Sequence, residues 1–120
     1  MANFIKTLYQ NILDRDPENQ AVVERWSNTA NSVGIAETIS SFFLSREFVS
    51  RNFTSEVFMD KLYRCILGRE ADDGGKQHYL DRYSGGDKIQ AIVNELINSA
   101  EYRQNVENNL APHPVVWPAT

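Results

Sequence analysis

Cysteine and histidine are scarce in this chain of 120 residues, and their scarcity excludes several kinds of site. Cys65 is the only cysteine, so neither an internal disulfide nor a cysteine-based zinc site can form. His78 and His113 are the only histidines, and they are not spaced as a pair of metal ligands. Cys65 lies in an apolar run, where we expect a small buried thiol rather than a nucleophile.

Clusters of basic residues and long apolar runs are also missing. The 12 Lys and Arg residues are outnumbered by 16 Asp and Glu residues, which gives a net charge of −4. We therefore expect no nucleic acid partner, because phosphate binding needs a concentrated basic surface. No apolar run approaches the ~20 residues that span a bilayer, and "MANFIKTLYQ" does not resemble a signal peptide. We expect no membrane insertion and, by default, a cytoplasmic protein; export through a C-terminal signal on a longer parent chain stays open.

An internal repeat is the most informative feature that is present. "LYQNILDRD" (residues 8–16) returns as "LYRCILGRE" (residues 62–70), an offset of 54 residues. The same offset aligns the two parts of the chain without a gap. The identical pairs are Phe4/Phe58, Leu8/Leu62, Tyr9/Tyr63, Ile12/Ile66, Leu13/Leu67, Arg15/Arg69, Ile35/Ile89, Ser45/Ser99 and Glu47/Glu101. We call residues 4–52 the first copy and residues 58–106 the second copy.

The spacing of apolar residues within each copy predicts helices and no strands. Apolar residues recur at i, i+1, i+4, i+5, i+8 and i+9 from Phe4 and again from Phe58, a broad stripe on one helical face. Each copy is predicted to hold three helices and a short fourth. The fold class is therefore all-α: two pseudo-symmetric repeats packed as one helical domain over residues 1–110, with the first helices face to face. Residues 111–120 are rich in proline and are predicted to form an extended tail or linker.

Helix ends are predicted from capping residues. Gly68 is expected to be left-handed at the end of the second copy's first helix, and Asp14 to hold the same place in the first copy. On this basis Asp14→Gly is expected to stabilise the domain by up to about 1 kcal/mol. Asp16-Pro17 is predicted to begin helix two, and Ser45 and Ser99 to begin the short fourth helices. Asn31-Ser32 and Ser84-Gly85-Gly86 are predicted to separate helix two from helix three.

Motifs that support catalysis or cofactor binding are weak. "SGGDKIQ" has two glycines and one lysine but lacks the pattern of a phosphate-binding loop. "EADDGG" (residues 70–75) has three acids without the alternating ligand spacing of a calcium loop, so we interpret the acids as serving a helix N-terminus. We expect no catalytic residues, no metal and no cofactor, and hence no enzyme.

Arg15 and Arg69 allow two interpretations. Each follows the end of a first helix and could contact a protein partner or a glycan. Alternatively, each folds back on the helix end and pairs with Glu47 or Glu101 of its own copy, which the recurrence in both copies favours. Tyr9 and Tyr63 fall on the apolar stripes and are predicted to be structural. The remaining candidates for binding are aromatic: Trp26, Tyr79, Tyr83 and Trp117.

The second copy resembles a known family. Its Leu62-Tyr63-Arg64, Leu67-Gly68-Arg69-Glu70, Asp72 to Gly75, Tyr79 and Ser99-Ala100-Glu101-Tyr102 are similar to the signature of a bacterial family of domains of unknown function, related to phycobilisome-linker domains. The first copy lacks the Gly after Leu and the Asp-x-x-Gly. The resemblance implies an all-helical module attached to surface-layer proteins, haemolysin-type secreted proteins and glycosyltransferases. The expected function is a non-catalytic protein-interaction or assembly module; the alternative is a carbohydrate-associated accessory module. The partner, protein or glycan, and the oligomeric state stay open.

Overall fold

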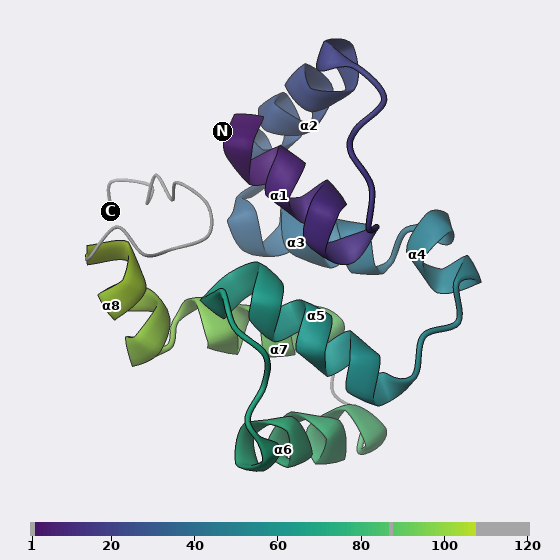
Figure 1. Ribbon diagram of the computed structural model, residues 1–120. Helices are drawn as coiled ribbons and strands as arrows, with labels where there is room; N and C mark the ends of the chain where they lie inside the picture. The colour runs from purple at the N-terminus through teal and green to yellow at the C-terminus, as the bar shows by residue number, and fades with distance from the viewer. Residues whose placement is uncertain (1, 87, 108–120) are drawn as a thin grey trace.

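The computed structural model describes residues 2–86 and 88–107, and their regular secondary structure is entirely helical (Figure 1). The predicted all-α class is confirmed, and the proposed tail with Trp117 and His113 lies outside the described residues. No described helix is both long and apolar enough to cross a membrane. The helices are α1 (Ala2–Ile12), α2 (Gln20–Val33), α3 (Ile35–Phe43), α4 (Arg46–Ser50), α5 (Ser55–Leu67), α6 (Asp73–Ser84), α7 (Ile89–Ile97) and α8 (Ala100–Glu107).

The two copies meet along two pairs of helices. Helix α1 packs on α5, as expected for the two first helices, and α3 packs on α7. Within each copy, the second helix packs on the first, so that α2 covers α1 and α6 covers α5. Figure 1 shows α2 and α6 at opposite ends of the molecule, with α1 and α5 between them. Each copy therefore supplies two helices to the shared core and one outer helix.

The core is formed by the apolar stripes that the sequence pattern identifies. Phe43 of the first copy stacks on Phe58 of the second, with ring centres 5.1 Å apart, and Phe48 meets the edge of Phe43 at the same distance. The stripe residues of the first helices are all buried: Phe4, Ile5, Leu8, Tyr9, Ile12, Leu13, Phe58, Met59, Leu62, Tyr63, Ile66 and Leu67. The hydrophobic interior is therefore shared between the copies rather than divided into two separate cores.

Two predicted helix boundaries are wrong. Helix α2 begins at Gln20, because the Asn19 side chain accepts a hydrogen bond from the Val22 amide and caps the helix. Asp16-Pro17 lies in the preceding loop instead, where the Asp16 carboxylate accepts from Gln10 at 3.0 Å. At its other end α2 continues through Asn31 and Ser32 and stops only at Gly34, whose φ of 95° few other residues tolerate.

The other predicted boundaries are confirmed. Ser45 and Ser99 accept hydrogen bonds from the Phe48 and Tyr102 amides at the starts of α4 and α8. Helix α6 ends at Ser84, with Gly85 as its cap. Gly68 and Asp14 are left-handed, with φ of 73° and 56°. Short-range capping chemistry therefore sets most helix ends, and the α1–α2 loop is the exception.

The Asp-x-x-Gly stretch before α6 has a structural explanation. Asp72 caps α6 by accepting a hydrogen bond from the Gly75 amide at 2.9 Å. A Cβ atom added at Gly75 would lie only 2.4 Å from the Tyr63 hydroxyl and 2.6 Å from Asp72 Oδ1. Tyr63 is buried and held in the core, so it cannot move aside freely. Glycine at position 75 therefore lets the first turn of α6 approach Tyr63 closely.

The two adjacent glycines of α6 should respond to alanine in opposite directions. We expect Gly75→Ala to lower the free energy of unfolding by about 1 kcal/mol, since overpacking costs about 1–3 kcal/mol and the better helix propensity of alanine returns up to about 1. Gly74→Ala meets nothing within 4 Å and should stabilise by about 0.5–1 kcal/mol. Urea titration measures the free energy of unfolding of both variants. Removing the Tyr63 hydroxyl by Tyr63→Phe should reduce the loss of stability caused by Gly75→Ala. Equal changes for Gly74→Ala and Gly75→Ala would contradict this explanation.

Candidate functional site

Arg15 connects the end of α1 to α4. Its Nε and Nη2 atoms donate to Glu47 Oε2 and Oε1, both at 2.8 Å, which is a two-pronged contact between a guanidinium and a carboxylate. Its Nη1 donates to the Asp16 carbonyl at 2.9 Å and also pairs with Glu18. The guanidinium lies over the Tyr9 ring, 4.9 Å from its centre. A single arginine thus fixes the α1–α2 loop against α4.

Arg69 repeats the contacts of Arg15 with the fourth helix, the following carbonyl and the tyrosine ring in the second copy. Its Nε and Nη2 donate to Glu101 Oε2 and Oε1 at 2.7 and 2.8 Å, and its Nη1 donates to the Glu70 carbonyl at 3.0 Å. The guanidinium lies over the Tyr63 ring at 5.3 Å. The bridge to Glu101, which recurrence in the sequence predicts, is confirmed, and most donors of Arg69 are used within the chain. This geometry supports a structural role for both arginines.

The arginines also set the charge state of their partners. The hydrogen bonds from Arg15 and Arg69 lower the pKa of Glu47 and of Glu101, so both carboxylates stay ionised to a lower pH than an ordinary glutamate. The side chains of Arg69 and Glu101 are 41% and 40% exposed, and solvent screens their attraction. The pairs therefore orient the short helices more than they stabilise the fold.

A double-mutant cycle should measure this coupling. For Arg69→Ala and Glu101→Ala we expect losses that are less than additive by about 0.5–1 kcal/mol, the range of a partly exposed ion pair with good geometry. Arg69→Lys should not restore the coupling, because one ammonium cannot make both hydrogen bonds. Free energies of unfolding from urea titration give the result. Strictly additive losses would mean that the contact contributes nothing.

The aromatic candidates are spread through the core instead of forming one surface. Trp26 is half-buried, with its ring 4.5 Å from that of Phe42. Tyr79 is buried and donates its hydroxyl to Glu95 at 3.1 Å, and Tyr83 packs against the edge of Phe58. Trp117 lies outside the described residues. The structure therefore does not bring Trp26, Tyr79 and Tyr83 together as a platform for a ligand.

The cysteine and the described histidine, which could in principle act as a nucleophile or a metal ligand, do not form such a site. Cys65 is fully buried, and burial raises the pKa of its thiol to about 12, which suppresses the reactive thiolate. His78 is exposed on α6, and its Nε2 lies 3.8 Å from Glu95 Oε1. Among the described residues, no three His, Cys, Asp or Glu side chains are grouped so that they could hold a metal ion.

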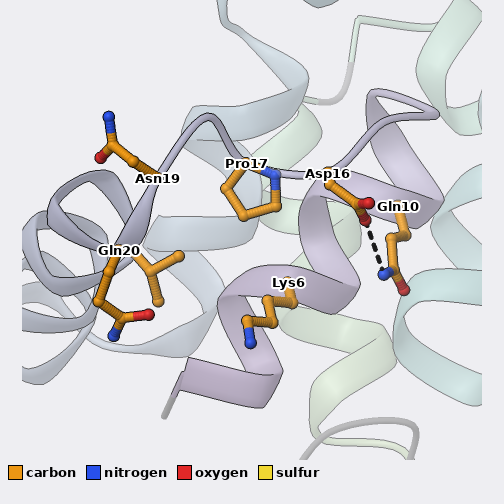
Figure 2. A pocket seen from close by; sticks show the side chains of 7 residues that line it. Lys6, Gln10, Asp16, Pro17, Asn19 and Gln20 are labelled. Carbon is orange, nitrogen blue, oxygen red and sulfur yellow. Dashed lines mark hydrogen bonds between the residues drawn. The ribbon is translucent and has the colours of Figure 1, made fainter.

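A pocket lies where α1, the α1–α2 loop and the start of α2 meet. Its volume is about 410 Å³. Figure 2 shows Pro17 in the middle, Asn19 and Gln20 to one side, the hydrogen-bonded Asp16 and Gln10 to the other, and Lys6 reaching from α1. Val23 completes the lining. Most of the lining side chains are polar, and both charges are present.

The equivalent surface of the second copy is built differently. At the positions of Gln10 and Asp16 stand Arg64 and Glu70, which form an ion pair of 2.9 Å. At the positions of Lys6 and Val22 stand Asp60 and Lys76, whose charged atoms lie 3.2 Å apart. Two salt bridges thus pair these four charges within the second copy. In the first copy an amide stands at the position of Arg64, and Val22, at the position of Lys76, carries no charge that could pair with Lys6.

The residues of this pocket form no recognisable sequence motif, but several of them differ between the two copies. The Arg–Glu pairs draw attention because they agree between the copies, whereas the pocket residues Lys6, Gln10, Asn19 and Gln20 are informative because they differ. At the same offset stand Asp60, Arg64, Asp73 and Gly74. Most aligned positions differ between the copies, so only the fold shows which of the differing residues line one surface.

Comparison with known proteins assigns the family. No curated protein matches the chain. The family model described as "Domain of unknown function (DUF4214)" matches residues 39–106, from within α3 into α8, with most of the match in the second copy. This match covers more than half of the chain, and it includes the Leu-Gly-Arg-Glu, Asp-x-x-Gly and Ser-x-Glu-Tyr stretches. The chain therefore belongs to the DUF4214 family.

Proposed function

We propose that the chain is a non-catalytic interaction module that binds a partner through the pocket beside the α1–α2 loop. Several side chains that could act as acids, bases or nucleophiles have structural environments. Cys65 is buried, and Glu47, Glu95 and Glu101 pair with arginines. These environments support binding rather than catalysis, because a catalytic group needs access to a substrate and a matched neighbour.

The contrast between the two copies is the observation that carries this proposal. Both copies hold the loop after the first helix with the same arginine clamp, so the framework does not require the two surfaces to differ. The second copy pairs its charged groups here in two salt bridges, whereas the first copy lines its pocket with the amides of Gln10, Asn19 and Gln20 beside the charged Lys6 and Asp16. A surface whose polar groups are not all paired internally can offer them to a partner. The second copy would then be mainly structural.

The alternative function, a more specific form of this proposal, is an accessory module for carbohydrates, and the polar pocket lining is the observation that supports it. Attachment to surface-layer proteins, haemolysin-type proteins or glycosyltransferases, which the family resemblance implies, would place such a module near glycans. A protein partner remains the expectation if recognition uses a larger surface than the pocket.

Site-specific photo-crosslinking tests the binding function with a matched control. A photoreactive residue in place of Gln20 lies at the pocket, whereas one in place of Gly74 lies at the equivalent exposed position of the second copy. Irradiation in cells of the source organism should give a discrete adduct of raised mass from position 20 and none from position 74. Identical patterns from both positions, or no adduct from position 20 with either a protein or a glycan, would overturn the proposal.

A further inference from the structure

We propose that the pocket between α1 and α2 takes a neutral, hydroxyl-rich ligand, one or two rings of a sugar chain. This inference deepens the proposed function and rests on it. The pocket has a volume of about 410 Å³, which falls within the range of about 300–1,000 Å³ that small-molecule sites occupy. The chemistry of the lining then decides which class of small molecule fits.

The lining offers hydrogen-bond donors and acceptors side by side. Asp16 uses Oδ1 to accept from Gln10, which leaves Oδ2 as an acceptor. Asn19 uses its side-chain oxygen to cap α2, which leaves its two N–H donors. Gln20 contributes both a donor and an acceptor group, and Lys6 contributes three donors. A ligand that fits this set must itself donate and accept within a short distance, as a hydroxyl does.

Other ligand classes match the lining less well. A phosphate needs donors throughout, and the Asp16 carboxylate would repel it. A metal ion needs several oxygen ligands, and the Lys6 ammonium would repel it. A peptide segment would need apolar recesses for its side chains, whereas Pro17 and Val23 supply only one small apolar area. That area suits the C–H face of a sugar ring.

The pocket is also held in shape before any ligand arrives. Arg15 fixes the loop through the Asp16 carbonyl, Glu18 and Glu47. The Gln10 amide orients the Asp16 carboxylate, and the cap on α2 fixes Asn19. A binding site whose polar groups are already oriented loses less conformational entropy when it binds. The arginine clamp therefore has a second role as the support of the pocket.

The test uses the whole chain on an array of immobilised neutral and charged glycans, followed by titration of the best glycan. We expect at least one neutral glycan to bind and to shift the side-chain amide NMR signals of Gln10, Asn19 and Gln20. Asp16→Asn keeps the size of the side chain and should weaken binding about tenfold, the effect of losing one charged hydrogen bond. Glu70→Gln, the equivalent change in the second copy, should leave the affinity unchanged. Thermal melts confirm that both variants fold.

Several outcomes would overturn the inference. An array without a bound neutral glycan rejects the ligand class, and so does equal weakening by Asp16→Asn and Glu70→Gln. If inorganic phosphate, magnesium or glycylglycine shifted these NMR signals saturably and no glycan did, the ligand class would be an anion, a cation or a peptide instead of a sugar. An empty array together with a crosslinked adduct from position 20 rejects the sugar and keeps the binding function. An empty array without that adduct rejects both proposals.

Discussion

A chain of residues 54–110 should not melt cooperatively as a monomer, although it contains the whole second copy. Removing the first copy uncovers the face of α5 that packs on α1 and the face of α7 that packs on α3. Phe58 would lose its stacking contact with Phe43 and its contact with Phe48. Each large apolar side chain that becomes exposed costs about 1.5–3 kcal/mol, and a folded domain has only about 5–15 kcal/mol of net stability.

Circular dichroism and sedimentation of this shorter chain give the result. We expect little helix at low concentration and no sharp thermal transition. Helix that appears with rising concentration would mean that a second molecule takes the place of the first copy, as the internal repeat suggests. A chain of residues 35–107 keeps α3 against α7 and should regain part of the helix. A cooperative transition of the monomeric 54–110 chain would show that the second copy has a sufficient core of its own.

The sequence predicts those parts of the fold that depend on burial and on short-range chemistry. The stripes that begin at Phe4 and Phe58 are recognisable because a buried helical face needs apolar residues at helical spacing. Ser45 and Ser99 are recognisable as caps because each acts on an amide three residues away. The arginine bridges join residues 32 apart, and only their recurrence in the sequence points to them.

What the sequence does not predict depends on contacts between elements. Asp16-Pro17 and Asn19 are both good starts for α2, and the contact of Asp16 with Gln10 on α1 leaves the cap to Asn19. The pocket has the same origin, because it forms only where Lys6 and Gln10 on α1 meet the loop and α2. No spacing rule within one element relates these residues. The family signature does not locate the pocket either, because its motif residues lie in the second copy.

Asp14 shows how a contact between the copies reverses an expectation from local geometry. Its left-handed backbone favours glycine, as predicted. However, its Oδ2 atom accepts from Lys61 Nζ at 2.8 Å, and Lys61 is only 5% exposed. The other neighbours of the ammonium are the Asn11 carbonyl at 3.4 Å and the ring of Phe53 at 4.8 Å. Asp14 is therefore the charge partner of a buried lysine.

We now expect Asp14→Gly to destabilise the domain by about 1–2 kcal/mol. Relief of the left-handed backbone returns up to about 1 kcal/mol. Loss of a charged hydrogen bond to a buried ammonium costs about 2–3 kcal/mol, which is the larger effect. Lys61→Met replaces the buried charge by an apolar side chain of similar length, and such replacements are often neutral or stabilising.

Whether Asp14→Gly stabilises or destabilises the domain should therefore depend on residue 61. In the Lys61→Met background no buried charge needs a partner. Only the longer, partly exposed contact of Asp14 with Arg51 at 3.6 Å then opposes the change, and because such pairs contribute little, Asp14→Gly should stabilise by up to about 1 kcal/mol. The pair of positions related to Asp14 and Lys61 by the 54-residue offset provides a natural parallel, since Gly68 of the second copy stands at the position of Asp14 and the uncharged Thr7 of the first copy at that of Lys61. Urea titrations of the unchanged chain, Asp14→Gly, Lys61→Met and the double variant measure this change of sign. If Asp14→Gly changed stability in the same direction in both backgrounds, the lysine would not be what keeps an aspartate at this left-handed position.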